Sequence, residues 1–171
     1  ADGVLLWSEE QYNGPVIPPT STLHLLKRDG SQANTVIATG EGTFSGYSVS
    51  GDTVTWGFMP PNPDLRTYIY SISSRISRAL TTGPALHPLV KDRTVVWTEG
   101  PFGAAGTPPY WSIKAYNLDS GQVTTPVRDV FQMTQAWALA RGNVVAFTID
   151  SGPNHRGSDL YALGFNFAGA P

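Results

Sequence analysis

Carboxylates that follow short hydrophobic runs are the side chains whose spacing could support chemistry. Glu9, Glu10, Glu99 and Asp150 each come two or three residues after an aromatic that ends such a run. A pair of carboxylates can hydrolyse a glycosidic bond, and several together can bind a divalent cation. No D-x-D-x-D-G calcium loop is present. Solvated charge at an acidic rim is therefore the favoured interpretation.

Histidine and serine patterns give no support to a metal site or to hydrolase chemistry. The histidines are His24, His87 and His155, and no H-x-H, H-x-x-x-H or H-E-x-x-H pair occurs. Such pairs are typical of zinc sites. The G-x-S-x-G turn of serine hydrolases is also missing from the sequence. The sequence predicts no catalytic residue, no metal and no cofactor.

Four short hydrophobic runs that end in a large aromatic side chain reveal an internal repeat. The aromatics are Trp7, Trp56, Trp97 and Phe147, and a second apolar run follows each of them. A period of about 40–50 residues built from short strands is typical of propeller blades. Because the aromatic recurs at one position in every unit, we expect it to pack between blades rather than to stack on a ligand.

Each unit contains up to four predicted strands, named a to d in chain order. Strand b ends in the aromatic, and strand c is the second apolar run. The runs are rich in Val, Ile, Thr, Tyr and Trp, which favour strands, and Gly, Asp and Asn occupy the short a–b and c–d turns, as tight hairpins require. The predicted fold is an all-β, four-bladed propeller of antiparallel strands in one domain, with approximate blades at 1–42, 43–83, 84–130 and 131–171.

The predicted b–c loops are long, and in a propeller they all emerge on one face. They span 8–21, 57–66, 98–110 and 148–158 and are rich in Pro and Gly. Long loops on a rigid scaffold often carry function, and stiff loops lose less entropy on binding. Their aromatics either form a contact surface or pack the loops against the blades. The candidate binding residues of this loop face are Glu9, Glu10, Tyr12, Phe58, Asp64, Arg66, Glu99, Phe102, Tyr110, Trp111, Asp150, His155 and Arg156.

Composition suits a domain of many short strands. Charged residues make up 14% of the 171 residues, below the roughly 25% of typical soluble domains. The net charge of −2 gives no attraction to nucleic acid or to an anionic membrane, and no apolar run is long enough to span a bilayer. There is no cysteine. Low charge with abundant Thr, Ser, Gly and Pro favours a secreted, periplasmic or cell-surface protein.

The repeat resembles that of TolB-like β-propellers, which belong to the broader WD40-like architecture. The resemblance rests on Gly-Asp-x-Val-x-Trp at 51–56, on the apolar strand c, and on Asn-Leu-Asp-Ser-Gly at 117–121. It covers essentially the whole chain, although the fourth unit has Phe147 in place of Trp. The resemblance implies the blade but no activity, since such blades occur in periplasmic scaffold proteins, surface-layer proteins and the lids of prolyl-oligopeptidase-like enzymes.

The first and last units contain fewer clear strands than the middle two. Unit one begins at strand b, and unit four ends after strand c with 165–167 as a weak strand d. Propellers protect their strand edges by closing a ring. The favoured expectation is therefore part of a larger propeller, which another polypeptide or further copies of this chain complete. The alternative is that four blades close alone.

Three functions from different classes follow from these patterns. The leading interpretation is a non-catalytic scaffold or binding module of a secreted or cell-surface assembly, which binds a protein partner through the b–c loops and the open blade edges. The second is the propeller portion of a larger hydrolase, such as a peptidase lid or a glycosidase. The third is a lectin-like carbohydrate binder that uses loop aromatics such as Trp111.

Overall fold

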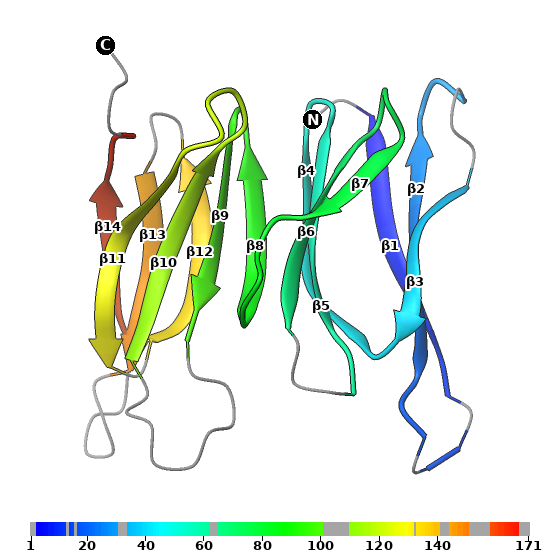
Figure 1. Cartoon of the computed structure of the whole chain (residues 1–171), viewed down its shortest axis with the longest axis horizontal. Helices are drawn as coiled ribbons and strands as arrows, with labels where there is room; N and C mark the ends of the chain where they lie inside the picture. The colour runs from blue at the N-terminus through cyan, green and yellow to red at the C-terminus, as the bar shows by residue number, and fades with distance from the viewer. Residues whose placement is uncertain are drawn as a thin grey trace.

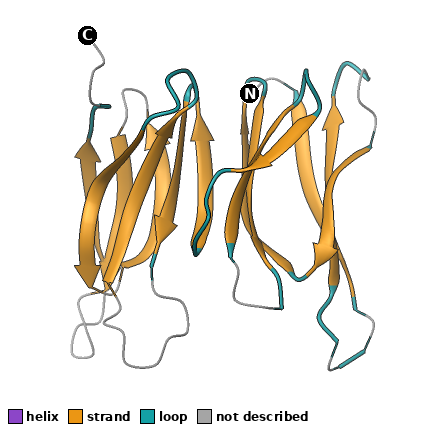
Figure 2. Cartoon of the chain, viewed as in Figure 1, coloured by secondary structure: helices purple, strands orange, loops and turns teal. Residues whose placement is uncertain are grey.

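The computed structural model describes residues 3–12, 14–15, 17–30, 34–61, 65–100, 110–131, 133–140, 144–150 and 158–167. These residues form strands joined by turns and loops, and none of them is helical (Figure 2). Four antiparallel sheets result, and within each sheet the strands are neighbours in chain order. The all-β, four-bladed propeller architecture predicted from the repeat is confirmed.

Each sheet is one blade, and the two end blades have three strands while the middle blades have four. Blade 1 contains β1 (Val4–Gln11), β2 (Thr20–Lys27) and β3 (Thr35–Glu41). Blade 2 contains β4 (Thr43–Ser50), β5 (Thr53–Met59), β6 (Arg66–Ser71) and β7 (Ile76–Ala79). Blade 3 contains β8 (Ala85–Lys91), β9 (Thr94–Glu99), β10 (Tyr110–Asn117) and β11 (Val123–Phe131). Blade 4 contains β12 (Met133–Ala140), β13 (Val144–Asp150) and β14 (Ser158–Gly164).

Two details of the predicted strands were wrong. The strands around the b–c loops run farther than the repeat suggested, so Glu9, Glu10, Glu99 and Asp150 lie inside strands and not in loops. The reason is that antiparallel pairing continues beyond the aromatic, as in Glu9 opposite Thr22. Residues 165–167 form no strand.

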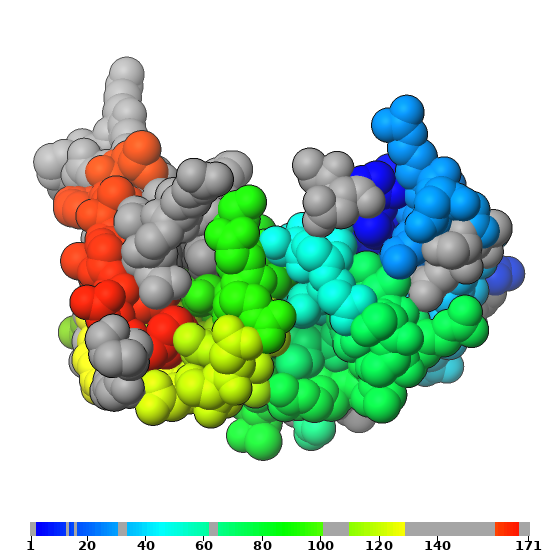
Figure 3. Space-filling model, turned by 90° about the horizontal axis from the view of Figure 1, so that it is seen from above, coloured from blue at the N-terminus to red at the C-terminus, as the bar shows by residue number. Residues whose placement is uncertain are grey.

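The blades stand side by side around an open arc (Figures 1 and 3). The first strands of neighbouring blades make the closest approach, since β8 contacts both β4 and β12, and β1 contacts β4. Seen from above, the described parts of blade 1 and blade 4 stand at opposite ends of the arc (Figure 3). One broad face of blade 1 is therefore not covered by another described blade.

Apolar side chains fill the spaces between blades because alternate residues of a strand point to opposite faces of its sheet. Leu23 and Leu25 of blade 1 pack in one cluster with Trp56 of blade 2. Ile69 of blade 2 packs in a second cluster with Trp97 of blade 3. The strand-b tryptophans of blades 2 and 3 thus lie between their own blade and the preceding one.

A third cluster joins blade 3 to the segment that follows β14. Phe167 is buried against four side chains of blade 3, namely Val96, Ile113, Ala115 and Val127. Phe165 packs on the same cluster and lies edge-on to Phe167, with ring centroids 5.7 Å apart. Residues 165–167, which were expected to pair as a strand, instead pack through their aromatic rings.

Candidate functional site

The predicted loop-face residues are spread over all four blades. Glu9 and Glu10 lie in β1, Phe58 in β5, Arg66 in β6, Glu99 in β9, Tyr110 and Trp111 in β10, and Asp150 in β13, while Tyr12 directly follows β1. Asp64, Phe102, His155 and Arg156 lie outside the described residues. The described members therefore lie near the ends of strands, on the side of the molecule where the b–c loops emerge (the loop end).

The aromatics at the loop end fall into two groups. Tyr12 and Tyr110 are exposed, whereas Trp111 is half-buried and packs on the cluster that contains Val96. The Tyr12 hydroxyl donates a 2.7 Å hydrogen bond to Oε2 of Glu10, and this bond, with the nearby negative charge, raises the pKa of Tyr12. Tyr12 and Tyr110 thus offer contact surface, while Trp111 serves packing.

A compact polar cluster lies on the open face of blade 1, and it consists of Trp7, Glu9 and His24 (the blade 1 trio). The Trp7 and His24 rings stack with centroids 4.9 Å apart and an interplanar angle of 7°. Nε1 of Trp7 donates to Oε1 of Glu9 at 3.3 Å, and Nε2 of His24 lies 3.6 Å from Oε2 of Glu9. His24 is buried, and its Nδ1 lies 2.9 Å from Oδ1 of Asn34.

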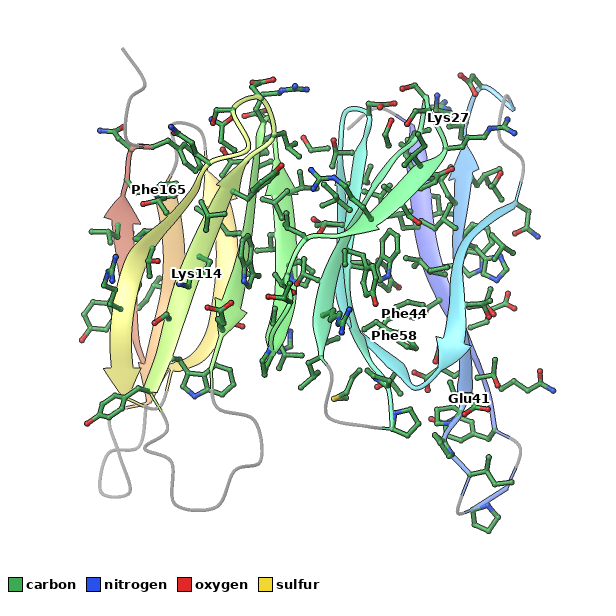
Figure 4. The ribbon with its side chains drawn as sticks, in the orientation of Figure 1. Lys27, Glu41, Phe44, Phe58, Lys114 and Phe165 are labelled. Carbon is green, nitrogen blue, oxygen red and sulfur yellow. The ribbon has the colours of Figure 1, made fainter. Side chains whose placement is uncertain are left out.

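Blade 3 has Trp97, Glu99 and Lys114 at the same strand positions (the blade 3 trio; Lys114 is labelled in Figure 4), but Nε1 of Trp97 is buried and has no hydrogen-bond partner among the described residues. Lys114 pairs with Trp97 across the sheet, just as His24 pairs with Trp7. Nζ of Lys114 lies 3.4 Å from Oε2 of Glu99. The two trios differ in exposure, because the Glu9 side chain is 69% exposed and that of Glu99 is 36% exposed.

Sequence reasoning missed both trios. Trp-x-Glu occurs at 7–9 and at 97–99, which is a signal that could have been noticed. The third residue of each trio, His24 or Lys114, comes from strand c, and the sequence alone does not say which strand-c residue lies opposite the tryptophan. That pairing depends on the register between the strands.

Two hollows lie at the ends of the strands away from the b–c loops, where the short a–b and c–d turns are. Their volumes are about 620 Å³ and about 530 Å³, and they share Val4, Gly51 and Asp52. The remaining charged residues of their linings are Lys27, Arg28, Asp29, Lys91, Asp92 and Arg93. Because acidic and basic side chains alternate around both hollows, neither attracts ions of one sign strongly.

Asp52 holds two turns of blade 2 together beside these hollows. Its carboxylate accepts hydrogen bonds from the Ser71 hydroxyl at 2.7 Å, the Ser73 amide at 2.8 Å and the Ser73 hydroxyl at 2.9 Å. Partial burial acts to raise the pKa of Asp52, but the hydrogen bonds from Ser71 and Ser73, with the charge of Lys27, outweigh it and lower the pKa. Asp52 is thus an ionised structural residue at neutral pH.

Several charged groups of the described residues form ion pairs. Arg93 and Asp119 form an exposed ion pair, which raises the pKa of Arg93 and lowers that of Asp119. Among the residues that the structure describes, no group of three or more His, Asp or Glu side chains could hold a metal ion. Within the same part of the chain, no helix is long and apolar enough to cross a membrane.

His87 should make stability depend on pH, because burial lowers its pKa below the ordinary value of 6.5, although a hydrogen bond with the Ser45 backbone opposes the shift. The unfolded chain then binds a proton more readily than the folded chain. The contribution of neutral His87 to the free energy of unfolding should be fully present above pH 6.5. It should be lost as the pH falls through the lower pKa that His87 has in the folded state. In urea titrations at pH 7 and pH 5, His87→Asn should reduce the difference between the two midpoints. Asn suits the positive φ of 50° at this position. An unchanged difference would contradict this role of His87.

Solved structures with the same architecture include proteins of different activities. TolB from Acinetobacter baumannii aligns at 15% sequence identity with a TM-score of 0.64, over 95% of this chain and 39% of that one. A putative TolB from Agrobacterium tumefaciens aligns at 15% identity with a TM-score of 0.64, over 94% and 57%. An oligogalacturonate lyase in complex with manganese aligns at 12% identity with a TM-score of 0.67, over 93% and 47%. No protein-family model matches the sequence, and no curated protein matches it.

These likenesses show the fold, which is that of a TolB-like β-propeller. The chain spans between about two fifths and three fifths of the length of these structures. The neighbours include both TolB proteins and a lyase, and a shared fold does not determine activity.

Proposed function

We propose that this chain is a non-catalytic propeller module that binds a further propeller blade on the open face of blade 1. The observation that carries the proposal is the blade 1 trio. It occupies, on an open face, the same strand positions as the blade 3 trio, whose tryptophan is only 3% exposed between blades 2 and 3. The open face of blade 1 carries the same residue pattern as a blade face that is buried against a neighbouring blade. Another propeller blade therefore suits it as a partner.

The surroundings of the blade 1 trio suit an apolar blade face. Leu5 and Val36 are 57% and 53% exposed. Both lie on the same face as the trio, because Val36 pairs with His24 and Leu5 alternates with the inward-facing Leu6. Covering them would contribute roughly 1–2 kcal/mol each. The expected partner surface is aliphatic, like Ile69 of blade 2, which packs with Trp97.

The proposed role is interaction rather than catalysis, because the described carboxylates already have structural partners. Glu9 lies beside His24, Glu99 forms an ion pair with Lys114, and Asp52 accepts hydrogen bonds from serines. We further propose that the module belongs to a secreted, periplasmic or cell-surface assembly. The low charged fraction of 14% supports this location. The loop end, with Tyr12 and Tyr110 exposed, is proposed as its second contact surface.

The first test is the native mass of the protein isolated from the cells that make it, measured by light scattering together with the intact mass of each polypeptide. We expect a particle heavier than the 18.4 kDa chain. The variant Leu5→Glu should return it to 18.4 kDa, because a charge on the open face of blade 1 would be buried by the partner. Heavier particles that contain this chain alone would identify the partner blade as a second copy.

The matched control is Ile76→Glu, which places the same charge on a 64% exposed apolar position of the outer strand β7. It should leave the native mass unchanged. A wild-type particle of 18.4 kDa, or a heavier particle that survives Leu5→Glu, would overturn the proposal.

A further inference from the structure

A pocket lined by aromatic rings lies between blades 1 and 2, on the side of blade 1 opposite its open face. Its volume is about 280 Å³. Figure 4 shows two of its rings, Phe44 and Phe58, between β5 and β3. The residues that line this aromatic pocket are Ile37, Ala38, Thr39, Phe44, Trp56, Phe58, Tyr68 and Ser77.

The aromatic pocket exists because blade 2 departs from the pattern of blades 1 and 3. The tryptophan of strand b is retained as Trp56, but Phe58 stands two residues later, where blades 1 and 3 have a glutamate. Tyr68 lies opposite Trp56 across the sheet, where blade 1 has His24 and blade 3 has Lys114, while blade 4 also has a tyrosine, Tyr161. The Glu99–Lys114 ion pair of blade 3 is thus replaced by two rings in blade 2.

The four rings stand in two pairs. Trp56 and Tyr68 stack with centroids 5.6 Å apart and an interplanar angle of 10°, while Phe44 and Phe58 are tilted by 55° with centroids 5.2 Å apart. Gly40 lets the second pair lie against β3, because a Cβ atom at Gly40 would be only 2.9 Å from Cζ of Phe58. The Phe58 ring of blade 2 therefore packs directly against the backbone of β3 in blade 1.

The outer gap between blades 2 and 3 differs from the aromatic pocket in its charge. It holds a pocket of about 260 Å³ whose lining includes Arg78 of the outer strand β7. Arg78 donates a 2.7 Å hydrogen bond to the Tyr116 hydroxyl and lies 5.5 Å from the centre of its ring. The lining of the aromatic pocket between blades 1 and 2 contains no charged residue.

We propose that the aromatic pocket binds a small neutral aromatic ring. None of its lining residues is acidic or basic, so a charged ligand would lose hydration without gaining a counter-charge. Ring walls favour a flat ring through offset and edge-to-face contacts. An apolar cavity of about 150 Å³ holds benzene, so this pocket has room for a bicyclic ring. Ser77 is exposed, and its hydroxyl suits a hydrogen-bonding group on the edge of the ligand.

The test is a calorimetric titration of the full chain with indole, with benzoate as a charged ring of similar type. We expect saturable binding of indole and at least tenfold weaker binding of benzoate. In a parallel NMR titration, indole should shift the methyl signal of Ala38 in the wild-type protein through its ring current. This second readout needs no variant.

Ala38→Leu should fill the aromatic pocket and weaken indole binding at least tenfold, while thermal unfolding shows that the variant is folded. The double variant Phe58→Glu, Tyr68→Lys, which introduces the ion pair of blade 3, should weaken binding to the same extent. Val36→Leu is the matched control, because it enlarges a residue of the same strand on the open face of blade 1, and it should change the affinity less than twofold.

The ring could belong to a free compound or to a tryptophan of a partner polypeptide, and the tripeptide Gly-Trp-Gly separates the two sources. Tighter binding of the tripeptide assigns the aromatic pocket to a polypeptide side chain, and tighter binding of indole assigns it to a free ring compound. No saturable binding of either probe, or full affinity in a folded Ala38→Leu protein, would overturn the proposal.

Discussion

Replacing Gly42 with alanine is expected to lower the free energy of unfolding by about 3 kcal/mol or more. Gly42 is the single residue between β3 and β4, and it joins blade 1 to blade 2. Its φ of 132° is rarely adopted by residues with a side chain. A Cβ atom there would overlap the Met59 carbonyl oxygen and lie 2.8 Å from Cα of Pro60. Urea unfolding followed by circular dichroism measures the loss.

Gly30→Ala is the control for the contribution of φ alone. Gly30 also has a positive φ, of 75°, but no atom lies within 4 Å of the position that its Cβ would take. Its replacement should cost about 1 kcal/mol. Equal losses for the two variants would show that the close approach of Gly42 to Met59 and Pro60 does not matter.

Trp97→Ala should destabilise the isolated 18.4 kDa chain by about 3–5 kcal/mol, since it removes a large side chain that is 3% exposed between blades 2 and 3. Trp7→Ala should cost about 1–2 kcal/mol in the same species, because Trp7 is only partly buried, on a face that no described blade covers. Urea titrations of both variants compare the two positions within one protein.

The same pair of variants also tests the open face of blade 1. If Trp7→Ala costs as much as Trp97→Ala in a particle shown to be monomeric, then part of this chain covers Trp7 in solution, and blade 1 does not have an open face. If the two costs become equal only in a heavier particle, a partner blade covers Trp7 there.

Local patterns were sufficient to predict the strands and their grouping into blades. Alternation of apolar residues, turn residues such as Gly51 and Asp52, and the recurring tryptophan are short-range signals. They predicted the three strands of blade 1 and the four strands of each middle blade, because antiparallel strands joined by tight hairpins pair with their neighbours in the chain. The weak fourth strand expected at 165–167 of blade 4 did not form. The positions of the strand ends were less accurate, since the pairing of Glu9 with Thr22 depends on the opposite strand.

The candidate sites could be predicted only in part. The sequence shows Trp-x-Glu at 7–9 and 97–99, but the position of His24 beside Glu9 follows from the register of β1 and β2. The aromatic pocket needs Phe44, Phe58 and Ala38 to meet from two blades, and no spacing in the sequence indicates that contact. The candidate binding residues come from the b–c loops, and although an open propeller was expected to expose apolar blade faces, no residue of those faces was singled out for that reason.

By itself, the sequence determined the all-β class, the order of strands and the repeat, because each of these depends on side-chain alternation and turn residues within a few positions of one another. Only the tertiary structure decided which face of each blade is covered. Trp7 and Trp97 occupy the same place in their repeats, yet Trp97 lies between two blades and Trp7 faces outward. The difference is that the structure describes a preceding blade for Trp97 and none for Trp7, and burial depends on that neighbour rather than on the residue.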